Sequence, residues 1–303
     1  MKQASEVENG LEEIIVAPDV VYGRKLGMAL TMDLYRPSRR SGAAVLFMNS
    51  GGFESGKLTQ YEMSDGGRPR ALGADELSLA ECPEPIPLLA QFSFAPLLAS
   101  GFTVFDVRHG SSPRFTLGEI VDDVRAALRF VRDEAQRFDV DPQRIGVWGA
   151  SAGGYLAIAL GTLDADDARQ GTRPRDPGAR VAAVAAYYAA GYDFLADADR
   201  FPEVIAQIPA LKIDRAALDA LSLKGRIGAA SPPTLIVYGT DDAPFITETC
   251  VNVDRDLVEA GAVSRLVALE GTGHEFSGQD GFHPQHALRA TEEMVSWFER
   301  YLS

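Results

Sequence analysis

Short runs of consecutive apolar residues recur along the chain and predict buried strands. They lie at residues 43–48, 101–107, 144–149, 180–188, 233–239 and 264–270. Continuous apolar runs of this length are typical of parallel strands that are covered on both faces. Two earlier segments, residues 12–23 and 26–37, predict an antiparallel pair of strands at the N-terminal end.

Between several of these runs, apolar residues recur at helical spacing. Residues 117–138 place four apolar side chains on one face: Ile120, Val124, Leu128 and Val131. Residues 292–302 do the same with Met294, Trp297, Phe298 and Tyr301. Alternating strands and helices predict an α/β fold, in which a mostly parallel central sheet carries helices on both faces and antiparallel strands at its N-terminal end.

Two stretches interrupt this alternation. Residues 57–87 are rich in glycine, proline and charge, and residues 191–230 hold helical fragments between strands. Both are too long for simple connections, and long loops in compact domains are commonly functional. We therefore expect one domain spanning residues 1–303, with both stretches inserted over the carboxyl edge of the sheet, where they cover the candidate site.

Composition narrows the classes of partner. The 303 residues are 46% hydrophobic, which is enough for a large core, and no stretch approaches the ~18 apolar residues of a membrane span. The polar N-terminus, MKQASEVENG, predicts a cytoplasmic protein. With 29 Lys and Arg against 43 Asp and Glu, the formal net charge is −14, which disfavours nucleic acid and anionic membranes as partners. A homodimer is compatible with this sequence.

The two cysteines, Cys82 and Cys250, have neither the spacing of metal ligands nor that of a disulfide framework. We expect free thiols and no metal site.

One strand leads directly into a candidate nucleophile. Gly149-Ala150-Ser151-Ala152-Gly153 fits the pattern G-x-S-x-G, after the strand 144–149 and before a helical segment at 154–163. Small neighbours allow the serine to occupy a tight strand-to-helix turn, with its hydroxyl exposed at the carboxyl edge of the sheet. The helix N-terminus then directs N–H groups toward developing negative charge. The alternative is a turn of small residues that serves packing alone.

A serine hydroxyl needs a base to remove its proton. The chain has four histidines, and His274 follows the last predicted strand, from where its ring can reach Ser151. His283 and His286 fall near the start of the final helix, and His109 follows an earlier strand. His274 is the predicted base.

The base in turn needs an acid to orient it. The strand 233–239 is followed by Thr240-Asp241-Asp242, and adjacent side chains in an extended segment point apart. The spacing G-x-x-D favours Asp242 as the acid, and Asp241 is the alternative. If Asp241 is not the acid, it can serve as a turn residue that bonds to its own backbone.

With these residues the chain resembles an α/β-hydrolase of the carboxylesterase type. It looks closest to the branch that holds acetyl esterases, feruloyl-esterase-like proteins and kynurenine formamidases. The resemblance lies in residues 118–154, which lead into Ser151, in ASPPTLIVYGTDD around Asp242, and in GTGHEF around His274. The order Ser151, Asp242, His274 is that of the superfamily.

One loop departs from the pattern. The family's oxyanion loop reads His-Gly-Gly-Gly or His-Gly-Gly-x, whereas this chain has Asn49-Ser50-Gly51-Gly52-Phe53. The resemblance implies an oxyanion hole formed by the backbone N–H groups of Gly51, Gly52 and Ala152. The Asn49 amide would replace the histidine in holding the loop.

The resemblance implies a serine hydrolase that cleaves carboxylic esters of short acyl chains through an acyl-enzyme, without metal or organic cofactor. The substrate would be a small molecule, with a sugar or another polar alcohol as leaving group. Candidate contacts are Asn49, Phe53 and Tyr192, and other aromatic residues that could line the pocket are Phe92, Phe94 and Phe115. Two alternatives remain: an arylformamidase or other amide hydrolase with the same triad, and a ligand-binding protein that has lost catalysis.

Overall fold

The computed structural model describes residues 14–63, 67–79, 86–162 and 180–303. Within them, eight strands form the central sheet: β1 (Ile14–Lys25), β2 (Met28–Pro37), β3 (Ala44–Met48), β8 (Thr103–Val107), β9 (Ile145–Ala150), β10 (Ala183–Tyr187), β11 (Thr234–Gly239) and β12 (Ser264–Leu269). Each lies on a segment that the apolar pattern predicts. The inner strands β3, β8, β9 and β10 are buried throughout, as continuous apolar runs require.

The strand order is β1-β2-β8-β3-β9-β10-β11-β12. The strands β1 and β2 pair antiparallel, and β2 also runs antiparallel to β8. From β8 to β12 every pairing is parallel. The predicted sheet, mostly parallel with antiparallel N-terminal strands, is confirmed. Its parallel strands end at one edge, where the loops after β3, β9, β11 and β12 meet.

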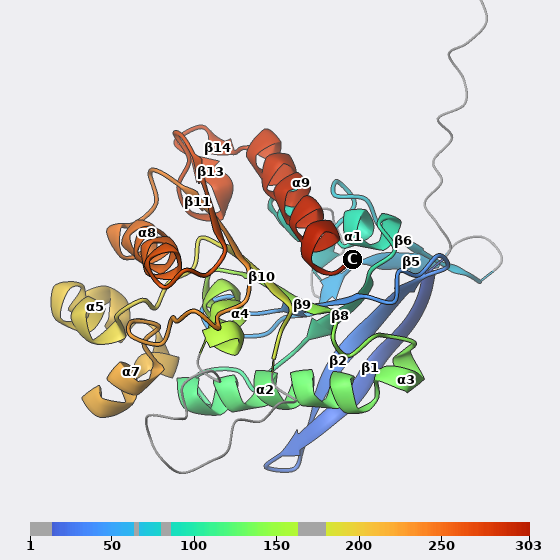
Figure 1. Ribbon diagram of the computed structural model, residues 1–303, viewed down its shortest axis with the longest axis horizontal. Helices are drawn as coiled ribbons and strands as arrows, with labels where there is room; N and C mark the ends of the chain where they lie inside the picture. The colour runs from blue at the N-terminus through green and yellow to red at the C-terminus, as the bar shows by residue number, and fades with distance from the viewer. Residues whose placement is uncertain (1–13, 64–66, 80–85, 163–179) are drawn as a thin grey trace, which may run out of the picture.

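Helices cover both faces of this sheet (Figure 1). The helices α2 (Leu117–Asp133) and α4 (Ala152–Thr162) lie on one face, and α1 (Ala95–Ala99) and α9 (Pro284–Tyr301) lie on the other. The helix α8 (Pro244–Glu259) connects β11 to β12. No helix in the described part of the chain is long and apolar enough to cross a membrane.

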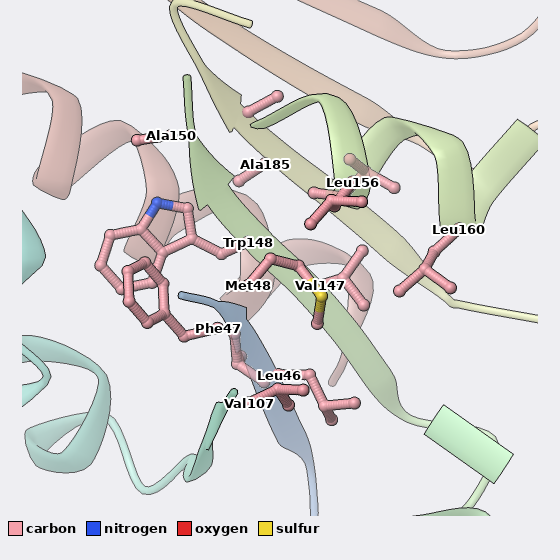
Figure 2. Packing of buried hydrophobic residues seen from close by; sticks show 14 of the residues in the cluster. Leu46, Phe47, Met48, Val107, Val147, Trp148, Ala150, Leu156, Leu160 and Ala185 are labelled. Atoms are coloured by element: carbon pink, nitrogen blue, oxygen red, sulfur yellow. The ribbon is translucent and has the colours of Figure 1, made fainter. Parts of the chain in front are cut away.

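The core fills the space between the sheet and these helices. Phe47 of β3 and Trp148 of β9 are register partners, and their ring centroids lie 4.6 Å apart on one face. On the opposite face Val147 meets Leu156 and Leu160 of α4 (Figure 2). Alternate side chains of β9 therefore pack into the core on opposite faces of the sheet. This packing fixes the orientation of β9 and of the turn that follows it.

One helical segment differs from the prediction, and the start of another agrees with it. Residues 117–138 form α2 and the short α3 (Ala135–Phe138), because Glu134 leaves helical geometry between them. The predicted face of α2 is buried as expected. The final helix begins at Pro284, as expected from the placement of His283 and His286 near its start, and proline at a first helical position is preorganised for the helix.

The two interrupting stretches hold short elements. Residues 57–87 contain β4 (Leu58–Thr59), β5 (Tyr61–Met63), β6 (Pro69–Ala71) and β7 (Ser78–Leu79), and lead into the 3₁₀ helix η1 (Pro87–Phe92). Residues 191–230 contain α5 (Phe194–Arg200), α6 (Pro202–Ala206), η5 (Pro209–Leu211) and α7 (Arg215–Leu221). Figure 1 shows α5 and α7 next to each other beyond the sheet, with α5 beside α8.

Candidate active site

Ser151 lies in the turn between β9 and α4. Its φ of 52° places it in the left-handed region, which is unusual for a residue with a side chain. Its N–H donates to the carbonyl of Tyr187 at 2.9 Å, so the turn is tied to the end of β10. Strained backbone of this kind is held by its surroundings and is common at functional sites.

The glycines around Ser151 are required by close backbone contacts. A Cβ on Gly149 would lie 2.3 Å from the carbonyl oxygen of Gly153, and one on Gly153 would lie 2.2 Å from that of Met48. Gly153 also donates its N–H to the carbonyl of Ser50. The motif therefore brings the start of α4 against the loop that follows β3.

Three side chains from three loops form a hydrogen-bonded series. The His274 Nε2 lies 3.0 Å from the Ser151 Oγ, and its Nδ1 lies 2.9 Å from the Asp242 Oδ2. The Asp242 side chain is only 2% exposed, and its Oδ1 accepts a hydrogen bond from the N–H of Ala243. His274 begins the 3₁₀ helix η6 (His274–Phe276) just after β12. The structure thus brings together Ser151, His274 and Asp242.

The neighbouring acid, Asp241, has a different role. Its side chain accepts a hydrogen bond from the Thr240 hydroxyl within the same turn. It has no hydrogen bond to His274 among the described residues, and it is exposed.

Two residues that the sequence did not single out support His274. The Tyr188 ring lies edge-on to the imidazole, with centroids 4.7 Å apart. Its hydroxyl donates to the Oε1 of Gln91, which is fully buried in η1. Tyr188 ends a predicted strand, so its place at the sheet edge was a signal, but no pattern indicated Gln91.

The loop after β3 is held by the Asn49 side chain. The Nδ2 donates to the carbonyl of Gly56 and to the Asp106 Oδ1, both at 2.9 Å. The Ser55 hydroxyl donates back to the Asn49 carbonyl. These bonds are internal to the protein, so the Asn49 amide shapes the loop, as the resemblance implied, and its two N–H groups are already donated.

The backbone N–H groups of this loop differ in availability. The Gly51 N–H donates to the carbonyl of Glu54 at 2.9 Å, which corrects the prediction that it faces an oxyanion. Among the described residues, no carbonyl accepts from Gly52 or Ala152, and both line the same cavity as Ser151. Gly52 has a φ of 57°, a conformation that glycine adopts without strain. Gly52 and Ala152 therefore have N–H groups that are available in the cavity that Ser151 lines.

Beneath this loop lies a group of buried charges. The Arg108 guanidinium bonds to Asp33 at 2.8 Å but approaches Asp106 only to 3.9 Å. Burial alone would raise the pKa of Asp33, but hydrogen bonds from Arg108 and the Asp19 N–H hold it below its usual value. Burial raises the pKa of Asp106 to about 7, despite the hydrogen bond from Asn49 and the charge of Arg108.

This difference predicts a pH-dependent stability that Asp106→Asn removes. The folded protein keeps the proton of Asp106 up to a pKa of about 7, whereas the unfolded chain loses it near the ordinary value. Asp106 therefore stabilises the fold at low pH, and its contribution is lost as pH rises toward 7. The free energy of unfolding of the wild type minus that of Asp106→Asn should fall by about 1.4 kcal/mol per pH unit between about pH 4 and 7 and then level off. Denaturant titrations of both proteins at several pH values measure this difference in unfolding free energy. A difference that rises with pH would contradict the raised pKa of Asp106.

Ser151 borders two cavities. The larger, of about 230 Å³, is lined by Ser151, Gly52, Asp242 and His274 and by residues of α5, α6, η5 and α8. The smaller, of about 130 Å³, extends from Ser151 past Ser50 and Gly51. Residues 191–230 supply five walls of the larger cavity: Phe194, Asp197, Ile205, Ile208 and Leu211. From residues 57–87, of which 64–66 and 80–85 are not described, Leu58 lines the smaller cavity.

The predicted aromatic contacts divide between these cavities and the core. Phe53 lines the larger cavity and Phe92 the smaller. Phe94 and Phe115 are buried in the core. The prediction for Tyr192 is corrected, because it lines neither cavity: its hydroxyl donates to Asp256 at 2.7 Å and also accepts from Arg255.

The remaining candidate residues lie elsewhere. His109 is buried, with its Nδ1 near the carbonyl of Gly110, and His283 pairs with Asp280 at the start of α9. Cys250 is a buried free thiol, and Cys82 lies outside the described residues. In the described ranges, no three His, Cys, Asp or Glu side chains come together as metal ligands.

Chemically, the series from Ser151 to Asp242 can move a proton. As the hydroxyl oxygen attacks an electrophile, the imidazole takes its proton, and the buried carboxylate stabilises the resulting positive charge. Backbone N–H groups that are not bonded within the protein, such as those of Gly52 and Ala152, can donate to negative charge on an oxygen bound in this cavity.

Comparison with known proteins gives three findings. The BD-FAE family model matches residues 89–255. The chain is 26% identical over 263 residues to the ethyl acetate hydrolase of Pseudomonas putida, and the match covers 82% of this chain and 72% of that one. It is 28% identical over 198 residues to the esterase LipC of Mycobacterium tuberculosis, and this match covers 61% of this chain and 48% of that one. A truncated carbohydrate esterase from gut microbiota superposes with a TM-score of 0.67 at 22% identity, covering 96% of this chain and 97% of that one, and so has the same fold.

Proposed function

The chain belongs to the BD-FAE family of α/β-hydrolases and is a carboxylic ester hydrolase, and from this premise we propose that it is a serine esterase whose nucleophile is Ser151. In this proposal His274 is the general base and Asp242 orients it. The observation that carries the proposal is the hydrogen-bonded series Asp242–His274–Ser151 at the junction of two cavities.

The reaction has two halves. The Ser151 oxygen attacks the ester carbonyl carbon while His274 takes the hydroxyl proton, and Gly52 and Ala152 donate their N–H groups to the oxyanion. His274 then gives the proton to the leaving alkoxide, and the acyl group stays on Ser151. Water, deprotonated by His274, attacks this acyl-enzyme, and His274 returns the proton to the Ser151 oxygen as the acid is released.

The two cavities suggest where each half of the ester binds. The leaving oxygen must lie within reach of His274, which lines the larger cavity and not the smaller one. We therefore assign the alcohol to the larger cavity and the acyl group to the smaller. A cavity of about 130 Å³ suits a short acyl chain, in agreement with the sequence-based expectation.

This assignment predicts a preference among acyl chains. The wild type should hydrolyse p-nitrophenyl acetate and butyrate with a kcat/KM at least about 10-fold above that for the octanoate, because added methylenes overpack a small pocket. Phe92→Ala, which enlarges the smaller cavity, should raise activity on the octanoate relative to the acetate. Phe245→Ala alters the larger cavity and is the matched control. A wild type that prefers the octanoate would exclude the assignment.

The complete series weighs against a non-catalytic binding protein, and no described residue that lines the two cavities selects a formyl amide over an ester. The single-domain organisation, the cytoplasmic location and the homodimer remain predictions of the sequence.

A further inference from the structure

The larger cavity has a buried acid in a wall that is otherwise apolar. Asp197 lies on α5 and is 7% exposed. Around it the cavity is lined by apolar side chains from α5, α6, η5, α8 and the residue before η5: Phe194, Ile205, Leu211, Phe245, Ile246 and Ile208. Among the described residues that line this cavity, Asp197 is the only one with a polar side chain besides Ser151, Asp242 and His274.

Nothing in the described protein satisfies this carboxyl group. No hydrogen bond reaches its oxygens, and the nearby charges are Asp193, Arg200 and Glu248. Arg200 is bound by both oxygens of Glu248 on α8, and Asp193 is bound by Lys224. Burial raises the pKa of Asp197 to about 7, with repulsion from Asp193 and Glu248 adding to the effect and Arg200 opposing it.

An apolar residue would line this wall at lower desolvation cost. Among the described residues Asp197 has no partner for its oxygens, yet they are open to the cavity and not sealed in the core. Its position is instead that of a polar group that orients a ligand in a mostly apolar pocket. The same cavity holds the His274 side of the site, where the leaving alcohol must lie in the proposed reaction.

We propose that Asp197 binds a hydroxyl group on the leaving alcohol, so that the preferred substrates are short-acyl esters of small aliphatic alcohols that carry a second hydroxyl. This inference rests on the proposed function. A hydroxyl both donates and accepts, so it can bond to a carboxyl group in either protonation state. The apolar walls disfavour a sugar with many hydroxyls, and about 230 Å³ is below the usual range for drug-sized ligands.

The test compares matched pairs of acetates. The kcat/KM is measured for monoacetates of α,ω-diols of three to six carbons and for the unsubstituted alkyl acetates of the same lengths. The wild type should favour the hydroxylated ester at one or more lengths by about 10-fold or more, the effect of one hydrogen bond to an acid. Asp197→Leu should abolish or reverse this preference, and Asp197→Asn should keep part of it.

The matched control is Asp199→Asn, because Asp199 lies on the same helix but is exposed and pairs with Arg215. It should keep the wild-type ratio. If Asp197→Leu does not fold, inhibition of the wild type decides: 1,4-butanediol or a neighbouring diol should inhibit p-nitrophenyl acetate hydrolysis at about 10-fold lower concentration than the matching alcohol.

The failures are distinguishable. A wild type that hydrolyses alkyl acetates without preferring the hydroxylated partner, or whose preference survives Asp197→Leu, overturns this inference and leaves the esterase intact. A preference found only for hydroxyls on the acyl half, measured with methyl hydroxyalkanoates, overturns the assignment to the alcohol. A wild type that cleaves no ester overturns the proposed function itself.

Discussion

Ser151→Ala and His274→Ala are each expected to lower kcat for p-nitrophenyl acetate by about 10⁴-fold. The first removes the atom that attacks, and the second removes the group 3.0 Å away that takes its proton. Because the two act as a unit, the double variant should be hardly slower than either single variant. Steady-state kinetics on proteins with matched melting temperatures measures these losses.

His283→Ala is the control for histidine loss. His283 pairs with Asp280 at the start of α9 and lines neither cavity. It should keep activity within about 2-fold, as surface substitutions away from the site do. Ser151→Ala with most of the wild-type activity would be incompatible with the proposed mechanism.

The second large effect is expected for Asp242→Asn, which should lower kcat by about 10³- to 10⁴-fold. The carboxylate accepts from two donors at once, the Ala243 N–H at Oδ1 and His274 at Oδ2. An amide has only one accepting oxygen, so its NH₂ group must face one of these two donors. If it faces His274, the imidazole takes the wrong tautomer and cannot accept the Ser151 proton.

Asp241→Asn is the matched control one residue away. Its side chain bonds only to Thr240 among the described residues and is exposed, so the variant should keep activity within about 2-fold. Equal losses in the two variants, or a larger loss for Asp241→Asn, would reassign the acid.

Much of the fold is predictable because the strands are buried on both faces. Each central strand is a continuous apolar run, and such runs stand out from the chain without reference to its partners. The limits of helices depend on single residues. Glu134 ends α2 within a periodic segment, and Pro284 begins α9 in a polar one, so periodicity alone gave neither limit.

Some residues of the site can likewise be predicted from the sequence, whereas others cannot. Ser151, Asp242 and His274 follow predicted strands, so topology alone brings them to one edge of the sheet. The bond that occupies the Gly51 N–H depends on the exact loop conformation, and the direction of Tyr192 depends on a contact with α8, 64 positions later in the chain. The burial of Asp197 depends likewise on packing between α5, η5 and α8. No periodicity in the sequence reports such contacts.

The acyl-enzyme on Ser151 is the central claim, and covalent labelling tests it most directly. p-Nitrophenyl dimethylcarbamate would transfer its carbamoyl group to the nucleophile, and the product hydrolyses slowly enough to be analysed by peptide mass spectrometry. The predicted result is release of one nitrophenol per enzyme, loss of esterase activity in parallel, and the carbamoyl group on Ser151, with no labelling of Ser151→Ala. A carbamoyl group on another residue, or inactivation of Ser151→Ala at the wild-type rate, would contradict it.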